Sequence, residues 1–433
     1  MRQETLRFAK NSCETFLARV LTILFGFIFS ILVVREFGSS GQGVIAFLST
    51  IVVLVVNFSN LGFPSANVYF TSKKNNFLPS IITNSLYISF VGGILFSAFG
   101  IIFLKYFAEE SLGKVNPLLV YVFLLTVPLN LVISLFSSIL LGSKKYRIFN
   151  IFAIIGSFLN LLAIIVASFS KKSLEDFLIM LVLVSVLNSI MYIKYYWRFV
   201  KLSRVFNSGL FNKMIRYGSK SYVASFLGFM IIRSDIFFVN YYLGTSEVGV
   251  YSIDVKFVDL IYLLPAIIGT ILFSEVASQS NEKKELTKKV FRLTFYFLIT
   301  LCFFVGLIFE PMILFLYGEE FIKAITPFFY LIPGIIALGL STILMQDLAG
   351  RGLPAIVYIA PAVSLVVNVV LNIILIPKMG ISGAAISSSV SYILMMMLMM
   401  YYFVSILKIR LSDLIIIKKS DIGFFINLFK RNG

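Results

Sequence analysis

Long apolar runs, repeated from one end of the chain to the other, constrain its fold more than any other feature. A helix needs about 20 apolar residues to cross the ~30 Å hydrocarbon core of a bilayer. Twelve runs reach that length, and 59% of the 433 residues are hydrophobic while only 13% are charged. The sequence therefore predicts an all-α integral membrane protein with twelve transmembrane helices. We expect them over residues 12–34, 44–69, 79–104, 117–141, 148–169, 176–197, 218–242, 249–274, 291–315, 325–347, 354–376 and 382–406.

The positive charges lie mainly in the short breaks between these runs. A formal net charge of +17 often indicates nucleic acid, but here the pattern fits membrane topology, and no nucleic-acid partner is expected. If residue 1 is cytoplasmic, 27 of the 37 Lys and Arg residues fall in inner segments and seven in outer ones. Because positively charged loops resist translocation, this bias predicts a multi-pass protein with both termini in the cytoplasm.

Residues suited to catalysis or metal binding are scarce. The chain has no histidine, which removes the commonest general base and metal ligand. Cys13 and Cys302 both lie in apolar surroundings without a paired spacing, so we expect neither a disulfide nor a metal site. The sequence predicts no catalytic residue, no cofactor and no enzymatic activity.

An internal repeat joins the two halves of the chain. Residues 37–44 and 243–250 share two glycines, a serine and a valine at a constant offset of 206, and each copy follows the first helix of a six-helix set. Because six is even, the two halves would cross in the same sense, related by a pseudo-two-fold axis along the membrane normal. This arrangement is typical of alternating-access transporters. We expect a six-helix bundle over 1–200, a basic cytoplasmic linker over 201–217, a second bundle over 218–408 and a cytoplasmic interfacial tail over 409–433.

Six charged residues lie well inside expected helices. Each costs about 2.5–3.5 kcal/mol at the centre of a membrane helix, so such groups normally face protein or water and mark a pathway. We interpret the cations as substrate-binding and the acids as ion-coupling or charge-balancing groups. The cations are Arg19, Arg233 and Lys256, and the acids are Asp235, Asp254 and Asp259.

Ion pairing within one helical hairpin is the alternative for several of these charges. Counting from the shared outer turn, Asp235 lies at the depth of Lys256, and Arg233 at the depth of Asp259. However, Arg233 and Asp235 project about 200° apart on their helix, so both pairs cannot form on one interface. Cavity lining and structural pairing both remain open.

Asparagines within the helices are a second group of polar candidates. Asn57 and Asn60 are predicted to bind substrate through sugar hydroxyls. Asn160, Asn188, Asn368 and Asn372 carry the same possibility. Each could instead hold two helices together by a hydrogen bond.

Two stretches resemble a known family. Leu371–Ser388 is similar to the segment joining helices 11 and 12 of bacterial polysaccharide-repeat flippases, which share a superfamily with multidrug and toxin extrusion antiporters and peptidoglycan-precursor flippases. Arg233–Asp235, with Leu243-Gly244 and Val248–Ser252 after it, is similar to the helix 7 to 8 region of that family. The resemblance implies a MATE-like pair of six-helix bundles around a cationic cavity.

The resemblance also implies a function. The expected activity is flipping of undecaprenyl-pyrophosphate-linked oligosaccharide repeats, for O-antigen, capsule or exopolysaccharide, across the bacterial cytoplasmic (inner) membrane. Arg19, Arg233 and Lys256 would contact the pyrophosphate. The implied partners are the lipid-linked oligosaccharide, membrane lipids, a polysaccharide polymerase and glycosyltransferases. Coupling to H⁺, Na⁺ or the membrane potential remains open.

Two other functions compete with this one. A cation-coupled multidrug antiporter would use the intramembrane acids. A membrane polysaccharide polymerase or glycosyltransferase would need a catalytic constellation on a large outer loop, and the longest such loop, about residues 105–117, holds only two glutamates and two lysines.

Overall fold

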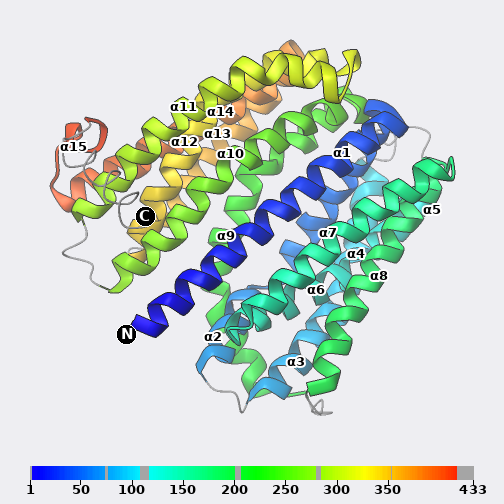
Figure 1. Cartoon of the computed structure of the whole chain (residues 1–433), viewed down its shortest axis with the longest axis horizontal. Coiled ribbons are helices and arrows are strands. Elements are labelled where there is room, and N and C mark those ends of the chain that lie inside the picture. The colour runs from blue at the N-terminus through cyan, green and yellow to red at the C-terminus, as the bar shows by residue number, and fades with distance from the viewer. Residues whose placement is uncertain are drawn as a thin grey trace. The chain divides into compact units, whose positions relative to one another are not determined.

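The computed structural model describes residues 2–73, 77–107, 117–199, 206–278, 284–352 and 354–416, which are almost entirely helical and contain no strand (Figure 1). The prediction of an all-α fold is confirmed. The elements are α1 (Arg2–Ser59), α2 (Phe63–Lys73), α3 (Leu78–Tyr87), a π-helical turn η2 (Ile88–Gly92), α4 (Gly93–Phe107), α5 (Pro117–Leu124), α6 (Val127–Gly142), α7 (Tyr146–Phe169), α8 (Leu174–Phe199), α9 (Ser208–Leu243), α10 (Thr245–Ser278), α11 (Lys284–Leu316), a 3-10 turn η4 (Glu319–Ala324), α12 (Ile325–Gly350), α13 (Pro354–Met379), α14 (Ile381–Leu407) and α15 (Ser412–Ile415).

The long helix α1 contains two membrane-crossing arms. Its apolar part, Glu14–Ser59, has 46 residues. At ~1.5 Å per residue this part would be about 70 Å long, more than twice the thickness of the hydrocarbon core. The helix is interrupted at Gly38, where φ is 65° and ψ is −167°, and each arm is long enough for one crossing. The described residues contain eleven helical segments of spanning length and composition. With the first counted as two arms, they accommodate the twelve crossings expected.

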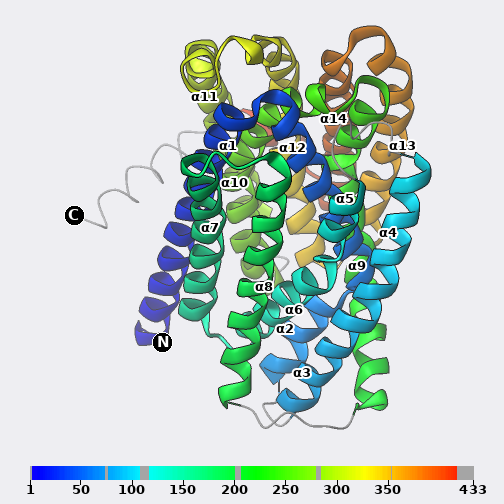
Figure 2. The ribbon, with the colours of Figure 1, turned by 90° about the vertical axis from the view of Figure 1, so that its right-hand side faces the viewer.

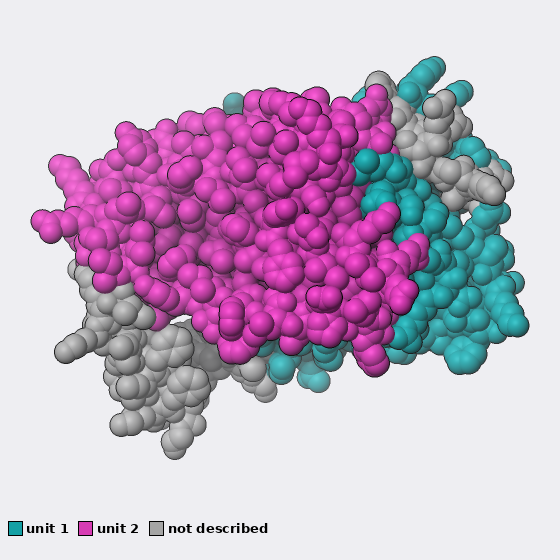
Figure 3. All heavy atoms as spheres, turned by 90° about the horizontal axis from the view of Figure 1, so that it is seen from above, with its two compact units in different colours: residues 1–229, 243–249 teal, residues 230–242, 250–433 magenta. Residues whose placement is uncertain are grey.

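The chain forms two compact units, coloured separately in Figure 3. Unit 1 comprises residues 1–229 and 243–249, and unit 2 comprises residues 230–242 and 250–433. The division falls inside α9, whereas the sequence suggested a linker over 201–217. Residues 208–217 are helical because they are amphipathic: Leu210 and Met214 are buried in unit 1, while Lys213 is exposed. Most of the tail expected over 409–433 lies outside the described residues.

Unit 1 is organised around α2, α6 and α8. Phe63, Phe136 and Tyr192 are among the buried residues of its core. Beside them the Nδ2 of Asn67 donates hydrogen bonds to Ser85 Oγ (3.1 Å) and to the carbonyl oxygen of Leu135 (3.1 Å). Around this core, α1 packs on α7, and α7 lies beside α8 (Figures 1 and 2).

Unit 2 is organised around the packing of α12 and α13 on α14. Small residues allow the close approach, since a Cβ on Gly334 of α12 would lie only 2.6 Å from the Cα of Ser389 on α14. Gly383, at the start of α14, lies directly against the carbonyl of Leu375 on α13. The small residues after Pro377 thus permit close helix packing.

Large apolar side chains cover much of the outer surface of the helices. In α11, Phe303, Phe304 and Leu307 each expose about three fifths of their surface. Exposed apolar surface on this scale is incompatible with water and fits contact with lipid. The protein is therefore a multi-pass membrane protein.

Candidate functional site

The two copies of the repeat meet within unit 1, and their backbones are in contact. Gly38 and Gly244 both have positive φ, 65° and 85°, which only glycine adopts readily. The side-chain oxygens of Ser39 and Ser246 lie 2.7 Å apart. The predicted correspondence between the two turns therefore extends to their backbone conformation.

The contact between the turns is reciprocal. A Cβ on Gly43 would collide with the carbonyl group of Thr245, and a Cβ on Gly249 would collide with the carbonyl group of Ser39. Gly43 corresponds to Gly249 and Ser39 to Thr245 at the same offset of 206. Such exchange of equivalent partners is what a local two-fold axis between the copies produces.

The charged residues of α9 and α10 form one ion pair in unit 2. The Nη2 of Arg233 lies 2.6 Å from the Oδ2 of Asp259, and their side chains keep 23% and 45% of their surface exposed. The Nη1 of Arg233 is buried and has no hydrogen-bond partner among the described residues. This cation therefore retains an unused donor.

Asp235 faces a different environment, as the helical geometry required. Its Oδ2 accepts hydrogen bonds from the hydroxyl of Tyr251 (2.6 Å) and from Ser388 (3.2 Å). The side chain is 2% exposed. Two ion pairs were possible from the depth of the charges in the membrane, Arg233 with Asp259 and Asp235 with Lys256. Among the described residues only the first forms, and Asp235 instead accepts hydrogen bonds from buried hydroxyl groups.

Asn368 extends this network across α9, α13 and α14. It accepts a hydrogen bond from the hydroxyl of Ser234 (2.8 Å) and another from Asn372 (2.9 Å), and its own amide lies 3.4 Å from Ser388 Oγ. Both asparagines are fully buried. Asn368 therefore has the interhelical role that the sequence left open, whereas Asn372 bonds to Asn368 within α13.

Lys256 and Asp254 have no hydrogen bond or ion pair in the described part of the chain. Lys256 is partly buried on α10. Asp254 is fully buried, and neither carboxylate oxygen has a partner among the described residues. A buried carboxylate without partners is costly in an apolar medium.

The predicted site residues of α1 lie in unit 1. The Arg19 side chain is exposed and makes no ion pair with a described acidic residue. Asn57 donates its amide to the carbonyl of Val53 (2.9 Å) within its own helix. Asn60 accepts a hydrogen bond from the backbone N–H of Gly62 (2.8 Å), where α1 ends. Within the described residues, both asparagines thus bond to local backbone, and neither bonds to a neighbouring helix.

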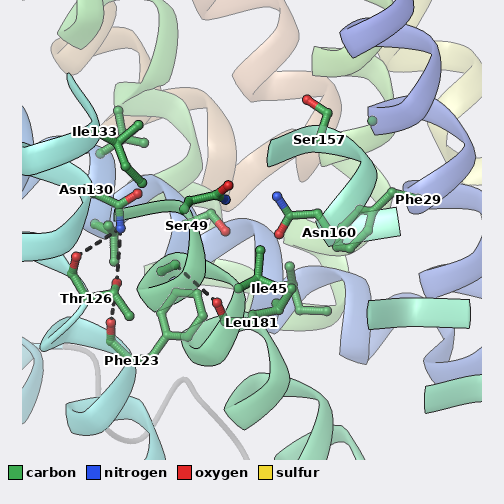
Figure 4. A pocket seen from close by; sticks show the side chains of 16 residues that line it. Phe29, Ile45, Ser49, Phe123, Thr126, Asn130, Ile133, Ser157, Asn160 and Leu181 are labelled. Carbon is green, nitrogen blue, oxygen red and sulfur yellow. Dashed lines mark hydrogen bonds between the residues drawn. The ribbon is translucent and has the colours of Figure 1, made fainter. Parts of the chain in front are cut away.

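A cavity inside unit 1 combines apolar side chains with several amides and hydroxyls, and the sequence predicted only some of these polar groups. Its volume is about 340 Å³, and five helices line it. Asn160 and Asn188 were singled out from the sequence, whereas Asn130 was not. Figure 4 shows Asn130 and Asn160 on opposite sides of the cavity. The lining residues are Gly26, Phe29, Ile45, Ser49, Val52, Val53, Phe123, Thr126, Asn130, Ile133, Ser157, Asn160, Leu181, Val184, Ser185 and Asn188.

Two known proteins are similar to this chain in sequence. A "Putative O-antigen transporter" of Shigella flexneri is 27% identical over 70% of this chain and 75% of its own length. A "Probable low-salt glycan biosynthesis flippase" of Haloferax volcanii is 25% identical over 46% of this chain, and the match spans 43% of that relative.

Solved structures share the fold. The lipid II flippase MurJ, in its inward closed conformation, is 19% identical and has a TM-score of 0.75, covering 94% of this chain and 89% of its own. An inward-facing multidrug resistance MATE family transporter is 15% identical with a TM-score of 0.74, covering 89% and 95%. The expected MATE-like fold is confirmed.

A match to a protein family covers more than half of the chain. Residues 31–326 match a family described as polysaccharide biosynthesis protein. This range includes the second arm of α1, both turns of the repeat and the charged residues of α9 and α10. The chain therefore belongs to the polysaccharide biosynthesis protein family.

Proposed function

We propose that this protein is a flippase that moves undecaprenyl-pyrophosphate-linked oligosaccharide repeats from the inner to the outer leaflet by alternating access. The observation that carries the proposal concerns two cations inside helices of a polysaccharide biosynthesis family member. Arg233 has a hydrogen-bond donor without a partner among the described residues, and Lys256 has no hydrogen bond or ion pair among them. A membrane helix retains such cations where water or an anion meets them. The names of the two sequence relatives, a glycan biosynthesis flippase and an O-antigen transporter, support a glycan as the cargo.

The chemistry of a pyrophosphate matches these cations. Guanidinium groups bind phosphate oxygens by charge-assisted hydrogen bonds, and the free Nη1 of Arg233 offers one such donor while Nη2 remains on Asp259. Lys256 adds a point charge with no acid bonded to it in the described structure. Arg19, on α1, would contribute a third cation. The polyprenyl chain would remain in lipid.

The membrane potential would favour the proposed direction of transport. Each elementary charge moved across the membrane is worth about 2.3 kcal/mol per 100 mV, so two negative charges moving outward gain about 4.6 kcal/mol. Asp254 is our candidate for additional coupling to H⁺ or Na⁺, because it is buried without partners. Asp235 and Asp259 would balance the positive charge.

The decisive test is flipping of a lipid-linked oligosaccharide in proteoliposomes. We expect Arg233→Ala and Lys256→Ala each to reduce initial flipping at least tenfold, and Arg19→Ala to weaken it as well. Lys378→Ala is the matched control, because that lysine is exposed at the end of α13. Normal transport by all three variants at normal expression would exclude the cationic mechanism.

A cation-coupled multidrug antiporter is the second candidate function. The buried Asp254 favours it, since an acid without partners can hold a proton or a cationic drug. Drug efflux that depends on Asp254, in a protein that flips no lipid-linked sugar, would establish this function instead.

We also propose the bacterial inner membrane as the location, with both termini cytoplasmic. Reporter fusions that are active only in the cytoplasm test this at residues 1 and 433. A polymerase and glycosyltransferases are the proposed neighbours of the flippase, and co-purification from mild detergent tests them.

A further inference from the structure

The cavity inside unit 1 is uncharged, and a small set of polar groups interrupts a mainly apolar lining. None of its 16 lining residues carries a charge, and the polar groups are three amides and four hydroxyls, supplied by Asn130, Asn160, Asn188, Ser49, Thr126, Ser157 and Ser185. Burying such groups in a membrane protein costs free energy unless they are hydrogen-bonded. The cavity therefore offers hydrogen bonds to a ligand of no net charge.

The amides are held in place by their own helices and leave their oxygens available. The Nδ2 of Asn160 donates to the carbonyl of Gly156 (3.0 Å), and the Nδ2 of Asn130 donates to the carbonyl (3.0 Å) and hydroxyl (3.3 Å) of Thr126. No hydrogen bond in the described structure uses the Oδ1 of either residue. These side chains are fixed acceptors on opposite sides of the cavity (Figure 4).

Asn188 adds a buried polar group that lacks a partner. It is 8% exposed, and its Oδ1 makes no hydrogen bond to any described residue. Its side chain packs against Gly156 of α7. A Cβ added to Gly156 would lie 3.3 Å from the Oδ1 of Asn188, so the glycine leaves room for the amide. Packing alone does not require an amide at this position, because an apolar side chain of the same size would avoid the cost of burying one.

Size and shape select the ligand class. One water molecule needs only about 10–15 Å³ of such space, and ligand sites begin near ~300 Å³, so the 340 Å³ cavity suits a small organic molecule. Fixed amide acceptors and hydroxyls complement a ligand rich in hydroxyl donors. Phe29 and Phe123 supply apolar surface for its C–H face.

We infer that this cavity binds one neutral pyranose ring of the transported oligosaccharide. The inference rests on the proposed function for the identity of the cargo, but the cavity chemistry is independent of the cations. The uncharged lining disfavours uronic acids and the pyrophosphate itself, because an anion would be desolvated without a countercharge.

Saturation-transfer NMR on the purified full-length protein in detergent tests the inference directly. The probes are methyl glycosides of neutral hexoses and of N-acetylhexosamine, with methyl glucuronide as the anionic comparison. We expect signals from at least one neutral glycoside and none from the glucuronide. Asn160→Leu, which keeps the volume but removes the amide, should reduce the signal at least fivefold.

Two further variants keep the test decisive. Ser185→Phe fills the cavity from α8 and should also remove the signal if Asn160→Leu does not fold. Asn150→Leu is the matched control on α7, because its amide bonds Thr15 and does not line the cavity. Absence of every neutral signal from folded wild-type protein, or equal signals from wild type and the cavity variants, would overturn the inference.

Flipping assays on the same samples separate this inference from the proposed function. Glycoside binding without flipping of lipid-linked sugar would leave the subsite standing and refute the flippase. Flipping without glycoside binding would leave the flippase standing and refute the subsite. If both hold, Asn160→Leu should raise the KM for the cargo about tenfold with kcat little changed.

Discussion

Substituting Gly249 by alanine should separate the two turns of the repeat. The new Cβ would lie 2.8 Å from the carbonyl carbon of Ser39 and 3.0 Å from the backbone nitrogen of Gly43, and closer still to the Ser39 oxygen. All three atoms are backbone, so no side chain can rotate to relieve the collision. The turns must therefore move apart or the helices must bend.

The cost follows from the number and kind of these contacts. Overpacking typically costs about 1–3 kcal/mol, and a collision with rigid backbone belongs in the upper part of that range. At about 1.4 kcal/mol per factor of ten, 2–3 kcal/mol lowers the population with the turns in contact roughly 30- to 140-fold relative to the separated arrangement.

Disulfide trapping measures that population. The side-chain oxygens of Ser39 and Ser246 are 2.7 Å apart, so cysteines at both positions, in a background lacking Cys13 and Cys302, should cross-link rapidly under mild oxidation. Adding Gly249→Ala should slow cross-linking at least tenfold. If the turns must part during transport, the cross-linked protein should flip no substrate until it is reduced.

Gly228→Ala is the matched control for this experiment. A Cβ on Gly228 of α9 would meet no atom within 4 Å, so cross-linking should remain at the parental rate. Unchanged cross-linking in Gly249→Ala would refute the argument, because it would mean that the backbones of the turns are not in contact.

Three further substitutions test polar contacts between side chains or with the backbone. Asp347→Ala should lower the free energy of unfolding, measured by thermal or denaturant unfolding in detergent, by as much as about 3–5 kcal/mol, because it removes the fully buried carboxylate that lies 2.6 Å from the Arg351 guanidinium. Asn67→Ala should cost about 1–3 kcal/mol in the same assay, because it leaves buried partners in unit 1 unsatisfied. Asp259→Asn should weaken the ion pair with Arg233 and change the rate of flipping. An unchanged rate would show that this ion pair does not take part in transport.

The helices were predictable because the bilayer imposes a minimum length on each. Every expected run consists largely of described helical residues, although some runs are divided between consecutive helices, and the sequence signal is the absence of charge over about 20 residues. Short irregularities within an apolar run were not predicted from this signal. The π-helical turn Ile88–Gly92 and the break before Pro128 leave the apolar run intact, so hydropathy cannot locate them.

The repeat was predictable because it depends on local counting, and the Arg233–Asp259 pair was one of the two pairs that such counting allowed. Depth and angular position on two helices joined by a tight turn fix which charges can meet. The Ser388 partner of Asp235 was not predictable in this way, because Ser388 lies 153 residues away on α14. The rotation of a distant helix is set by packing, which hydropathy does not encode.

The unit 1 cavity escaped prediction for a related reason. Its polar groups are single hydroxyls and amides, each unremarkable within its own helix. Asn130 and Asn160, for example, bond within their own helices like many polar residues in membrane proteins. Only the packing of five helices shows that they face one space.

The two units concentrate different chemistry, and the difference bears on selectivity. Unit 2 holds Arg233, Lys256 and the three intramembrane acids, whereas the cavity of unit 1 is lined only by neutral groups. The proposed cargo has the same division, since its pyrophosphate is common to all repeats and its sugars vary. Cations recognise phosphate largely without regard to the attached sugar, while a cavity with fixed amide acceptors discriminates strongly against a ligand that lacks the matching hydroxyl. Recognition of the carrier would then reside in the cations, and the choice of sugar in the cavity of unit 1.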